Sequence, residues 1–376
     1  MKDAIVILGG GLAGLTAAIH LSKLGHCVSV IEKNTYPKHK VCGEYISNEV
    51  VDYFKWLDLE TVFHQAQPIT DFKLALSASH LAQVQLPLGG FGISRYLLDD
   101  VLYRKAKAQN CVFIHDVFTK IDFQNEVFSI TLQSGAILES KIVLGAFGKR
   151  STIDLQLKRS FIQKKSHWMA VKAHYKGNFP NEMVGLFPFE GGYCGVSKVE
   201  NNRINVCYLV KTTIFKKYKN SSEFEKNVLH RNQGLSEVLS TSESCFDKPL
   251  AISQISFLPK QAVENHVLML GDAAGLIHPL CGNGMAMAIH SAKIASELIH
   301  LSLQETNLNR NKLEESYIKA WNKTFKNRLT MGQLLSKILL NPKLTTLVLK
   351  TIARSPRFLQ WMIKKTHGKP ISISSL

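Results

Sequence analysis

The sequence AIVILGGGLAG, residues 4–14, decides the fold. Residues 4–8 form a continuous apolar run, as expected of a parallel strand that is covered on both faces. Gly9, Gly11 and Gly14 then have the GxGxxG spacing, directly before a segment with helical periodicity. A strand, a glycine turn and a helix in this order predict the first unit of a Rossmann-like α/β fold that binds a nucleotide.

The glycines and their neighbours each have a physical role in such a site. The first glycine permits the tight turn, the second lets the backbone approach a pyrophosphate, and the third lets helix and strand pack closely. The amide groups of Leu12 and Ala13 open the helix and point its positive end at the anion. A second apolar segment, residues 27–31, ends in Glu32 and Lys33, and an acid at this position can accept hydrogen bonds from both ribose hydroxyls. The expected ligand is therefore an ADP-containing dinucleotide, either FAD or NAD.

A second glycine-rich turn, GDAAGLIHPLCGNG at residues 271–284, stands between a short apolar strand and an Ala-rich helix. An NAD dehydrogenase would normally continue from the first motif with more βα units, so this late turn favours FAD. The two motifs together resemble the flavoprotein hydroxylase (p-hydroxybenzoate hydroxylase-like) superfamily, and within it the geranylgeranyl reductase branch. The resemblance implies that Gly271 and Asp272 lie at the ribityl chain of FAD. It also implies a loop beside the isoalloxazine ring that contains Pro279, Gly282, Asn283 and Gly284.

Two further segments carry the same resemblance. ISRYLLD at residues 93–99 is similar to the family's RxxFD segment, with Leu in place of Phe. This similarity implies that Arg95 lies at the FAD phosphates or the flavin edge, and a planar guanidinium suits phosphate oxygens. KVCGE at residues 40–44 resembles the geranylgeranyl reductase branch more than the aromatic hydroxylases, and such a loop passes close to the flavin. The residues of this loop that are expected to bind the cofactor are Lys40, Cys42 and Gly43.

Two interpretations of Cys42 stay open. It is either a neighbour of the flavin, which tunes the potential or donates a proton to a substrate carbon, or a small packed residue. In the second interpretation Glu44 caps the helix that follows. Cys42 is therefore the single catalytic candidate of the chain.

The middle motif departs from the family pattern. A strand at residues 141–144 runs into Gly-Ala-Phe-Gly, with Phe147 where the family usually has Asp, followed by Gly148 as an expected cofactor contact. Many hydroxylases of the family use this region for both FAD and NADPH. The departure argues against direct reduction by NADPH along the usual route, so NADH, NADPH and a protein electron donor all stay open as the reductant.

The chain is expected to divide into three parts. Strand-like alternation in the middle of the sequence predicts an antiparallel β-sheet substrate domain inserted into the FAD-binding domain. Its apolar pocket is expected to contain Phe187, Phe189 and Tyr193. The predicted parts are a discontinuous FAD-binding domain at residues 1–70, 90–160 and 250–300, the β-rich substrate domain at 71–89 and 161–249, and a helical region at 301–376. In the last part, helices are expected at residues 313–329, 334–352 with a break around Asn341-Pro342, and 357–365.

Composition limits the partners and the compartment. The net charge of +17 is concentrated late: residues 310–369 hold 14 Lys and Arg against two acids, interleaved with apolar residues, and no nucleic-acid motif accompanies them. Peripheral membrane contact through this region is one expectation, and helices packed on the domain with basic outer faces are the other. Seven scattered cysteines without metal-ligand spacing predict a reducing compartment and no metal. No apolar run approaches the roughly 20 residues of a membrane span, so a cytoplasmic protein is expected, and membrane association stays open.

These observations favour an FAD-dependent oxidoreductase that acts on a hydrophobic substrate, with hydride transfer from reduced flavin to a C=C bond. The alternative is an FAD monooxygenase that hydroxylates an aromatic or polyketide-like substrate through a flavin hydroperoxide. A third interpretation is a flavoprotein without catalysis that docks on a membrane or a partner. The Trp-rich WxWxIP signature of tryptophan halogenases is absent, which argues against halogenation.

Overall fold

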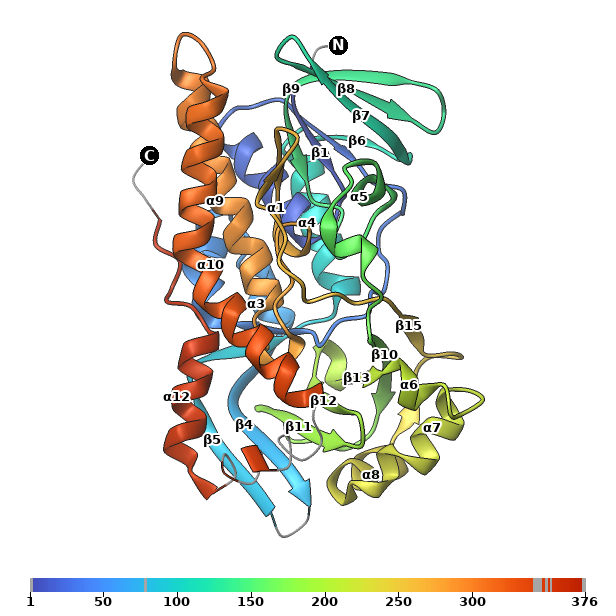
Figure 1. Cartoon of the computed structure of the whole chain (residues 1–376). Coiled ribbons are helices and arrows are strands. Elements are labelled where there is room, and N and C mark those ends of the chain that lie inside the picture. The colour runs from blue at the N-terminus through green and yellow to red at the C-terminus, as the bar shows by residue number, and fades with distance from the viewer. Residues whose placement is uncertain (1–2, 78–79, 341–346, 349–350, 352–353, 374–376) are drawn as a thin grey trace.

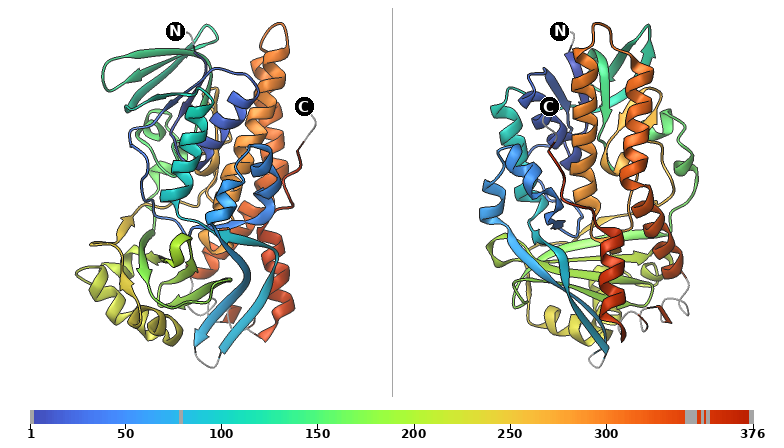
Figure 2. Two further views of the ribbon diagram at one scale, coloured as in Figure 1. Left: turned by 180° about the vertical axis from the view of Figure 1, so that it is seen from behind. Right: turned by 90° about the vertical axis from the view of Figure 1, so that its left-hand side faces the viewer.

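The computed structural model describes the chain except for residues 1–2, 78–79, 341–346, 349–350, 352–353 and 374–376. Two sheets organise the described residues, one in the upper and one in the lower half of Figure 1. Long helices run along the upper sheet, and further helices cover the lower one (Figures 1 and 2). The α/β class with a second, β-rich part and a helical C-terminal region is thereby confirmed.

The first sheet has a parallel centre, in the order β16-β17-β9-β1-β2-β6, and β7 and β8 extend it beside β9. Leu8 at the end of β1 pairs with Ile31 of β2 and with Gly145 of β9, and Met269 of β17 pairs with Gly145 as well. Because parallel strands end at the same edge, the turns after these strands meet there. The strands are β1 (Asp3–Leu8), β2 (Val28–Ile31), β6 (Val112–Ile114), β7 (Phe118–Gln124), β8 (Val127–Leu132), β9 (Ile137–Gly145), β16 (Val263–Glu264) and β17 (Val267–Met269).

The second sheet is antiparallel except between β11 and β4, in the order β14-β10-β13-β12-β11-β4-β5-β3, with β15 on β10. Residues 45–47 and 250–252 pair in this sheet, although the sequence assigned both segments to the FAD-binding part. The strands are β3 (Tyr45–Ser47), β4 (Gln67–Ser77), β5 (His80–Gly92), β10 (Trp168–Lys176), β11 (Met183–Phe189), β12 (Gly192–Lys198), β13 (Ile204–Lys211), β14 (Glu243–Ser244) and β15 (Leu250–Ile252).

Helix α10 runs without a break through residues 330–333, where the sequence predicted a helix end. It lies beside α9, which packs on α1 (Figure 1). The predicted break at Asn341-Pro342 lies outside the described residues. No helix in the described ranges combines the length and the apolar composition that a bilayer span needs. The α-helices are α1 (Leu12–Lys23), α2 (Val51–Trp56), α3 (Thr61–Gln65), α4 (Arg95–Ala108), α5 (Thr152–Gln156), α6 (Thr212–Phe215), α7 (Ser221–Asn227), α8 (Gln233–Ser240), α9 (Gly284–Gln304), α10 (Arg310–Leu340) and α12 (Pro356–Thr366).

The two faces of the second sheet carry different cores. One face includes Phe187 and packs under α7 and α8, where Phe224 of α7 belongs to the same core, while the other face includes Leu186 and Tyr193 and packs against α12. Strand residues alternate between the two faces, so neighbours in sequence belong to different cores. The face toward α12 is the one that borders the candidate site.

Candidate functional site

The first glycine turn is closely packed at two of its three glycines. Gly9 has φ +106°, and a Cβ added to it would lie 2.6 Å from the carbonyl oxygen of Ala146. A Cβ added to Gly14 would lie 2.0 Å from the carbonyl oxygen of Gly9. At Gly11 the nearest atoms to an added Cβ are 3.9 Å away. Open space beside the second glycine is what a pyrophosphate requires.

Two cations border this open space. The guanidinium of Arg95 and the ammonium of Lys40 are the groups found 3.9 Å from the Cβ position at Gly11. Both bind the buried carboxylate of Asp99, Arg95 through two hydrogen bonds of 2.7 and 2.8 Å and Lys40 through one of 2.8 Å. Burial opposes ionisation of Asp99, but the two cations hold its pKa below the usual value. One carboxylate between two cations leaves a net positive charge for an anion, and α1 begins here without a side-chain cap.

Glu32 is held in one orientation at the end of β2. Its Oε2 accepts from the amide of Gly10 at 2.8 Å, and its Oε1 accepts from the amide of Asn34 at 2.9 Å. Glu32, Lys33 and Phe147 line one cavity at this edge of the sheet. An oriented carboxylate at the mouth of a cavity fits the ribose and adenine end of the dinucleotide.

The two glycine turns meet in space. Gly271 has φ +54°, and a Cβ added to it would lie 3.2 Å from the side chains of Ala13 in α1 and Ala288 in α9. The half-buried Lys260 donates from its ammonium to the carbonyl oxygen of Asp272 at 2.7 Å and so fixes the second turn. The predicted convergence of the N-terminal and the late motif is therefore present in the fold.

A large apolar cavity begins beyond this point. The loops around Cys42 and Leu280 border it on one side, strands β11, β12 and β13 on another, and α12 on a third. Among the predicted site residues, the cavity brings together Cys42, Gly43, Pro279, Gly282 and Tyr193. Lys149, Cys207 and Cys281 line it as well and were not predicted.

Asn283 and Gly284 follow at the start of α9. The Asn283 side chain is buried, donates to Glu49 Oε1 at 2.6 Å and accepts from Arg328 Nη1 at 3.0 Å. Contact between Asn283 and a cofactor would consequently be made through the backbone. Helix α9 has no side-chain N-cap, so its first amides are available to an anionic ring edge. The cofactor roles of Asn283, Gly284 and Gly148 stay predictions.

The predicted pocket roles of Phe187 and Phe189 need correction. Both side chains lie on the face of the second sheet that packs under α7, where the Phe189 ring lies 5.8 Å from that of Phe224. Leu186, one position away in β11, lines the cavity instead. The prediction identified the correct strand, β11, but chose the residues of the wrong face, because successive side chains of a strand point to opposite faces of the sheet.

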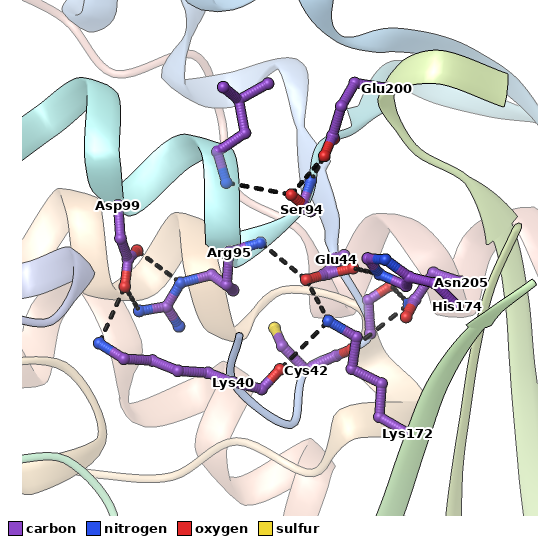
Figure 3. A network of polar contacts seen from close by, with 12 residues as sticks. Lys40, Cys42, Glu44, Ser94, Arg95, Asp99, Lys172, His174, Glu200 and Asn205 are labelled. Carbon is purple, nitrogen blue, oxygen red and sulfur yellow. Dashed lines mark hydrogen bonds and ion pairs between the residues drawn. The ribbon is translucent and has the colours of Figure 1, made fainter. Parts of the chain in front are cut away.

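A buried polar network holds the Cys42 loop and was not predicted. Glu44 is fully buried and pairs with Lys172, and it binds His174 Nε2 at 2.7 Å (Figure 3). Asn205 donates to the carbonyl oxygens of Cys42 and Gly43 at 3.3 and 2.8 Å. The second sheet therefore grips the loop by its backbone and leaves Cys42 at the cavity wall.

The interpretation in which Glu44 caps the helix after it is wrong. Glu44 accepts from the amide of Arg95 at 2.7 Å and so caps α4, much later in the chain. Burial opposes its ionisation, but bonds from His174 and Lys172 keep its pKa below the usual value. Lys172 and His174 alternate with apolar residues along β10. From sequence alone, this alternation predicts that both side chains point to solvent, so it gives no sign of a buried network.

Comparison with known proteins agrees with this geometry. A family model described as an FAD binding domain matches residues 2–311. The chain is 24% identical over 406 residues to the conditioned medium factor receptor 1 of Dictyostelium discoideum, covering 97% of this chain and 77% of the relative. It is 24% identical over 347 residues to the digeranylgeranylglycerophospholipid reductase 1 of Methanosphaera stadtmanae, covering 85% and 80%. A geranylgeranyl bacteriochlorophyll reductase-like structure from Thermoplasma acidophilum superposes with a TM-score of 0.78 at 17% identity, over 97% of this chain and 95% of that one.

Proposed function

We propose, from the premise that this chain belongs to the FAD binding domain family and is an FAD-dependent oxidoreductase, that it reduces a C=C bond of a hydrophobic substrate. The observation that carries the proposal is the apolar cavity, which begins at the two loops expected beside the flavin and continues between the second sheet and α12. A predominantly apolar cavity of this kind selects an apolar ligand.

The residues around the glycine turns fit FAD from end to end. Glu32 orients toward the ribose, while the amides of α1 with Arg95 and Lys40 offer the positive charge that a pyrophosphate needs. The turn at Gly271 lies against Ala13 of α1, and the loop that follows this turn lines the apolar cavity at Pro279 and Gly282, so a ribityl chain would run along it. FAD supplies a hydride from its N5 position when it is bound and reduced.

The chain's own groups then have two tasks at the substrate. The apolar walls exclude water, and a proton must reach the carbon that does not receive the hydride. Burial raises the pKa of Cys207 and of Cys281 to about 12, so both thiols stay protonated at neutral pH. Cys42 lines the same cavity as these two thiols and is the proposed proton donor. Solvent then returns a proton to the Cys42 thiolate.

The relative named as a digeranylgeranylglycerophospholipid reductase supports a polyprenyl lipid as the substrate class. The electron donor is proposed to be NADH, NADPH or a reduced protein. Phe147 lines the cavity beside Glu32, at the position where the resemblance leads one to expect an acid. A nicotinamide nucleotide that binds in addition to FAD would therefore need another route to the flavin.

The test is anaerobic. Protein loaded with FAD is reduced with dithionite and mixed with polyprenyl alcohols and polyprenyl glycerophospholipids, and flavin absorbance and product mass are followed. We expect the flavin to be reoxidised without oxygen and the product to gain two hydrogen atoms. Reoxidation that requires oxygen, with a hydroxylated product, would replace this proposal with a monooxygenase. The same assay with NADH and NADPH in place of dithionite identifies the reductant.

A further inference from the structure

Helix α12 has two faces with different surroundings. Its inner face belongs to the cavity wall, whereas its outer face is exposed at the surface in front of β4 and β5 (Figure 2, right). The residues of the inner face recur every three or four positions, as in an amphipathic helix that lies on a surface. The α12 residues that line the cavity are Leu359, Met362, Ile363 and Thr366.

The outer face exposes two large aromatic side chains. Phe358 is 41% exposed and Trp361 is 48% exposed, and their rings stack with centroids 5.7 Å apart. Lys365 lies over Trp361, with its Nζ 5.8 Å from the ring centroid. Stacked aromatic rings next to a lysine form an amphipathic patch, apolar in the middle and charged at the edge.

Positively charged residues flank this patch along the chain, and no acid accompanies them in this part of the sequence. Arg357, Lys364, Lys365 and Lys369 are all exposed. No Asp or Glu occurs in the sequence from residue 316 to the end. Leu347 and Ile373, before and after α12, are 63% and 43% exposed and add apolar surface to the same region of the chain.

We propose that the outer face of α12 docks on an anionic lipid bilayer and that the apolar cavity behind the helix takes its substrate from that bilayer. Aromatic rings insert into a bilayer at the level of the lipid headgroups. Each lysine near an anionic bilayer contributes about 1 kcal/mol to the free energy of binding. A nucleic-acid duplex bound through its phosphates, or an acidic protein surface, would use the cations but would bury little of Phe358 and Trp361. The combination of exposed rings and cations on one side of a cavity wall is what selects the bilayer.

The binding test is independent of catalysis, although the role of the cavity rests on the proposed function. FAD-loaded protein is sedimented with vesicles of phosphatidylcholine alone and with vesicles of equimolar phosphatidylcholine and phosphatidylglycerol. We expect binding to the anionic vesicles only, and a blue shift of Trp fluorescence, because Trp361 is exposed whereas Trp168 and Trp321 are buried and Trp56 is half-buried. FAD content, measured from the visible spectrum, shows separately whether the cofactor site is intact.

Two variants and two matched controls localise the contact. Removing both rings in Phe358→Ala/Trp361→Ala should abolish vesicle binding, and Lys364→Gln/Lys365→Gln should weaken it about thirtyfold. The controls remove an exposed apolar side chain or exposed lysines elsewhere, in Ile137→Ala and in Lys216→Gln/Lys217→Gln, and should bind as the parent does.

Three outcomes would overturn the proposal. The first is equal binding to both kinds of vesicle or to neither. The second is binding that the α12 variants retain or that the controls lose equally. The third is binding that survives without Phe358 and Trp361 but is released by a soluble polyanion such as polyglutamate, because an acidic macromolecule would then be the partner. Normal lipid reduction in detergent together with absent vesicle binding would reject the docking surface and keep the proposed function.

Discussion

At the residue scale, two glycines of the first turn have different roles: Gly14 is needed for folding, and Gly11 is needed for cofactor binding. A methyl group at Gly14 would overlap the carbonyl of Gly9, whereas one at Gly11 meets nothing closer than 3.9 Å. Gly14→Ala should therefore lower the free energy of unfolding by about 2 kcal/mol or more. Gly11→Ala should leave the stability of the FAD-free protein unchanged and abolish FAD binding. Urea unfolding and quenching of FAD fluorescence check the two effects, and a Gly11→Ala protein that binds FAD normally would place the pyrophosphate elsewhere.

Tyr193 carries a hydroxyl group whose partner is missing from the described part of the chain. The side chain lines the apolar cavity, its hydroxyl is buried, and burial, with the nearby thiols of Cys207 and Cys281, raises its pKa well above the usual value. A buried hydroxyl without a partner costs stability unless a ligand satisfies it. Tyr193→Phe should thus keep or raise the melting temperature but weaken binding of a substrate with a polar head by about tenfold.

Tyr175→Phe is the matched control for this prediction. Tyr175 is a buried tyrosine of β10 that belongs to the core on the other face of the sheet and does not line the apolar cavity. Removal of its hydroxyl should leave substrate affinity unchanged. Equal affinities of both variants and the parent in a flavin-absorbance titration would show that Tyr193 contacts no polar group of the substrate.

Local spacing could predict the residues at the glycine turns but not those at the cavity. Gly11 and Glu32 were predicted because phosphate and ribose sites demand fixed residue types at fixed offsets, whereas Arg95 was predicted from the family resemblance. Phe187 was misplaced because alternation along a strand says which residues share a face, not which face meets the ligand. Lys149 was missed because a single lysine in a loop has no pattern at all.

At the element scale, strand β10 clamps the loop of Cys42. Lys172 pairs with Glu44 and also donates to the carbonyl oxygen of Lys40 at 3.3 Å. Lys172→Met removes the cation and leaves a buried carboxylate with one partner fewer, which should lower the free energy of unfolding by about 3 kcal/mol. The loosened loop should expose Cys42, and iodoacetamide should alkylate it faster, as peptide mass spectrometry can measure for this site alone.

Lys176, at the exposed end of the same strand, provides the control. Lys176→Met should change neither the stability nor the alkylation rate of Cys42. If Lys172→Met speeds alkylation of all cysteines equally, the effect is global unfolding and β10 has no specific hold on the loop.

Many elements could be predicted because hydrophobic period and turn residues are local properties. Helices α6, α7 and α8 were not predicted, and α10 is one helix where two were expected, at residues 313–329 and 334–352. A Cβ added to Gly332 would lie 3.0 Å from the amide nitrogen of His278, so this glycine permits close packing of α10 on the loop that contains His278. Glycine in a helix can mark an end or a contact, and only the tertiary structure distinguishes the two.

At the scale of the whole molecule, the site exists because β17, β9, β1 and β2 are neighbours in one parallel sheet. This order brings the turn after residue 270 next to the turn after residue 8, and no local rule fixes it. The family resemblance supplied that step in the sequence analysis. Physical reasoning from the residues supplied the ligand class at each turn, and both were needed to predict one dinucleotide held at both ends.

The whole fold should also lose stability in mild acid, because buried histidines hold their neutral form. Burial lowers the pKa of His278 to about 3, and burial with nearby Lys293 and His300 does the same for His20. The unfolded chain takes up these protons near the ordinary value of 6.5, while the folded chain does not, so the free energy of unfolding falls as the pH falls below that value. Each histidine should contribute a fall of about 2 kcal/mol between about pH 7 and about pH 5.

Carboxylates do not account for a fall in this window, and Glu225, whose pKa burial raises to about 7, opposes the fall because it takes up its proton in the folded protein. The pKa values of Glu44 and Asp99 are lowered, so the stability that these groups contribute is present above their ordinary values and is lost only at lower pH. Urea unfolding at a series of pH values measures the slope, and His278→Gln and His20→Gln should each flatten it, because glutamine keeps a polar group but cannot titrate. A slope that neither variant changes would mean that both histidines are protonated in the folded protein and that other groups carry its response to acid.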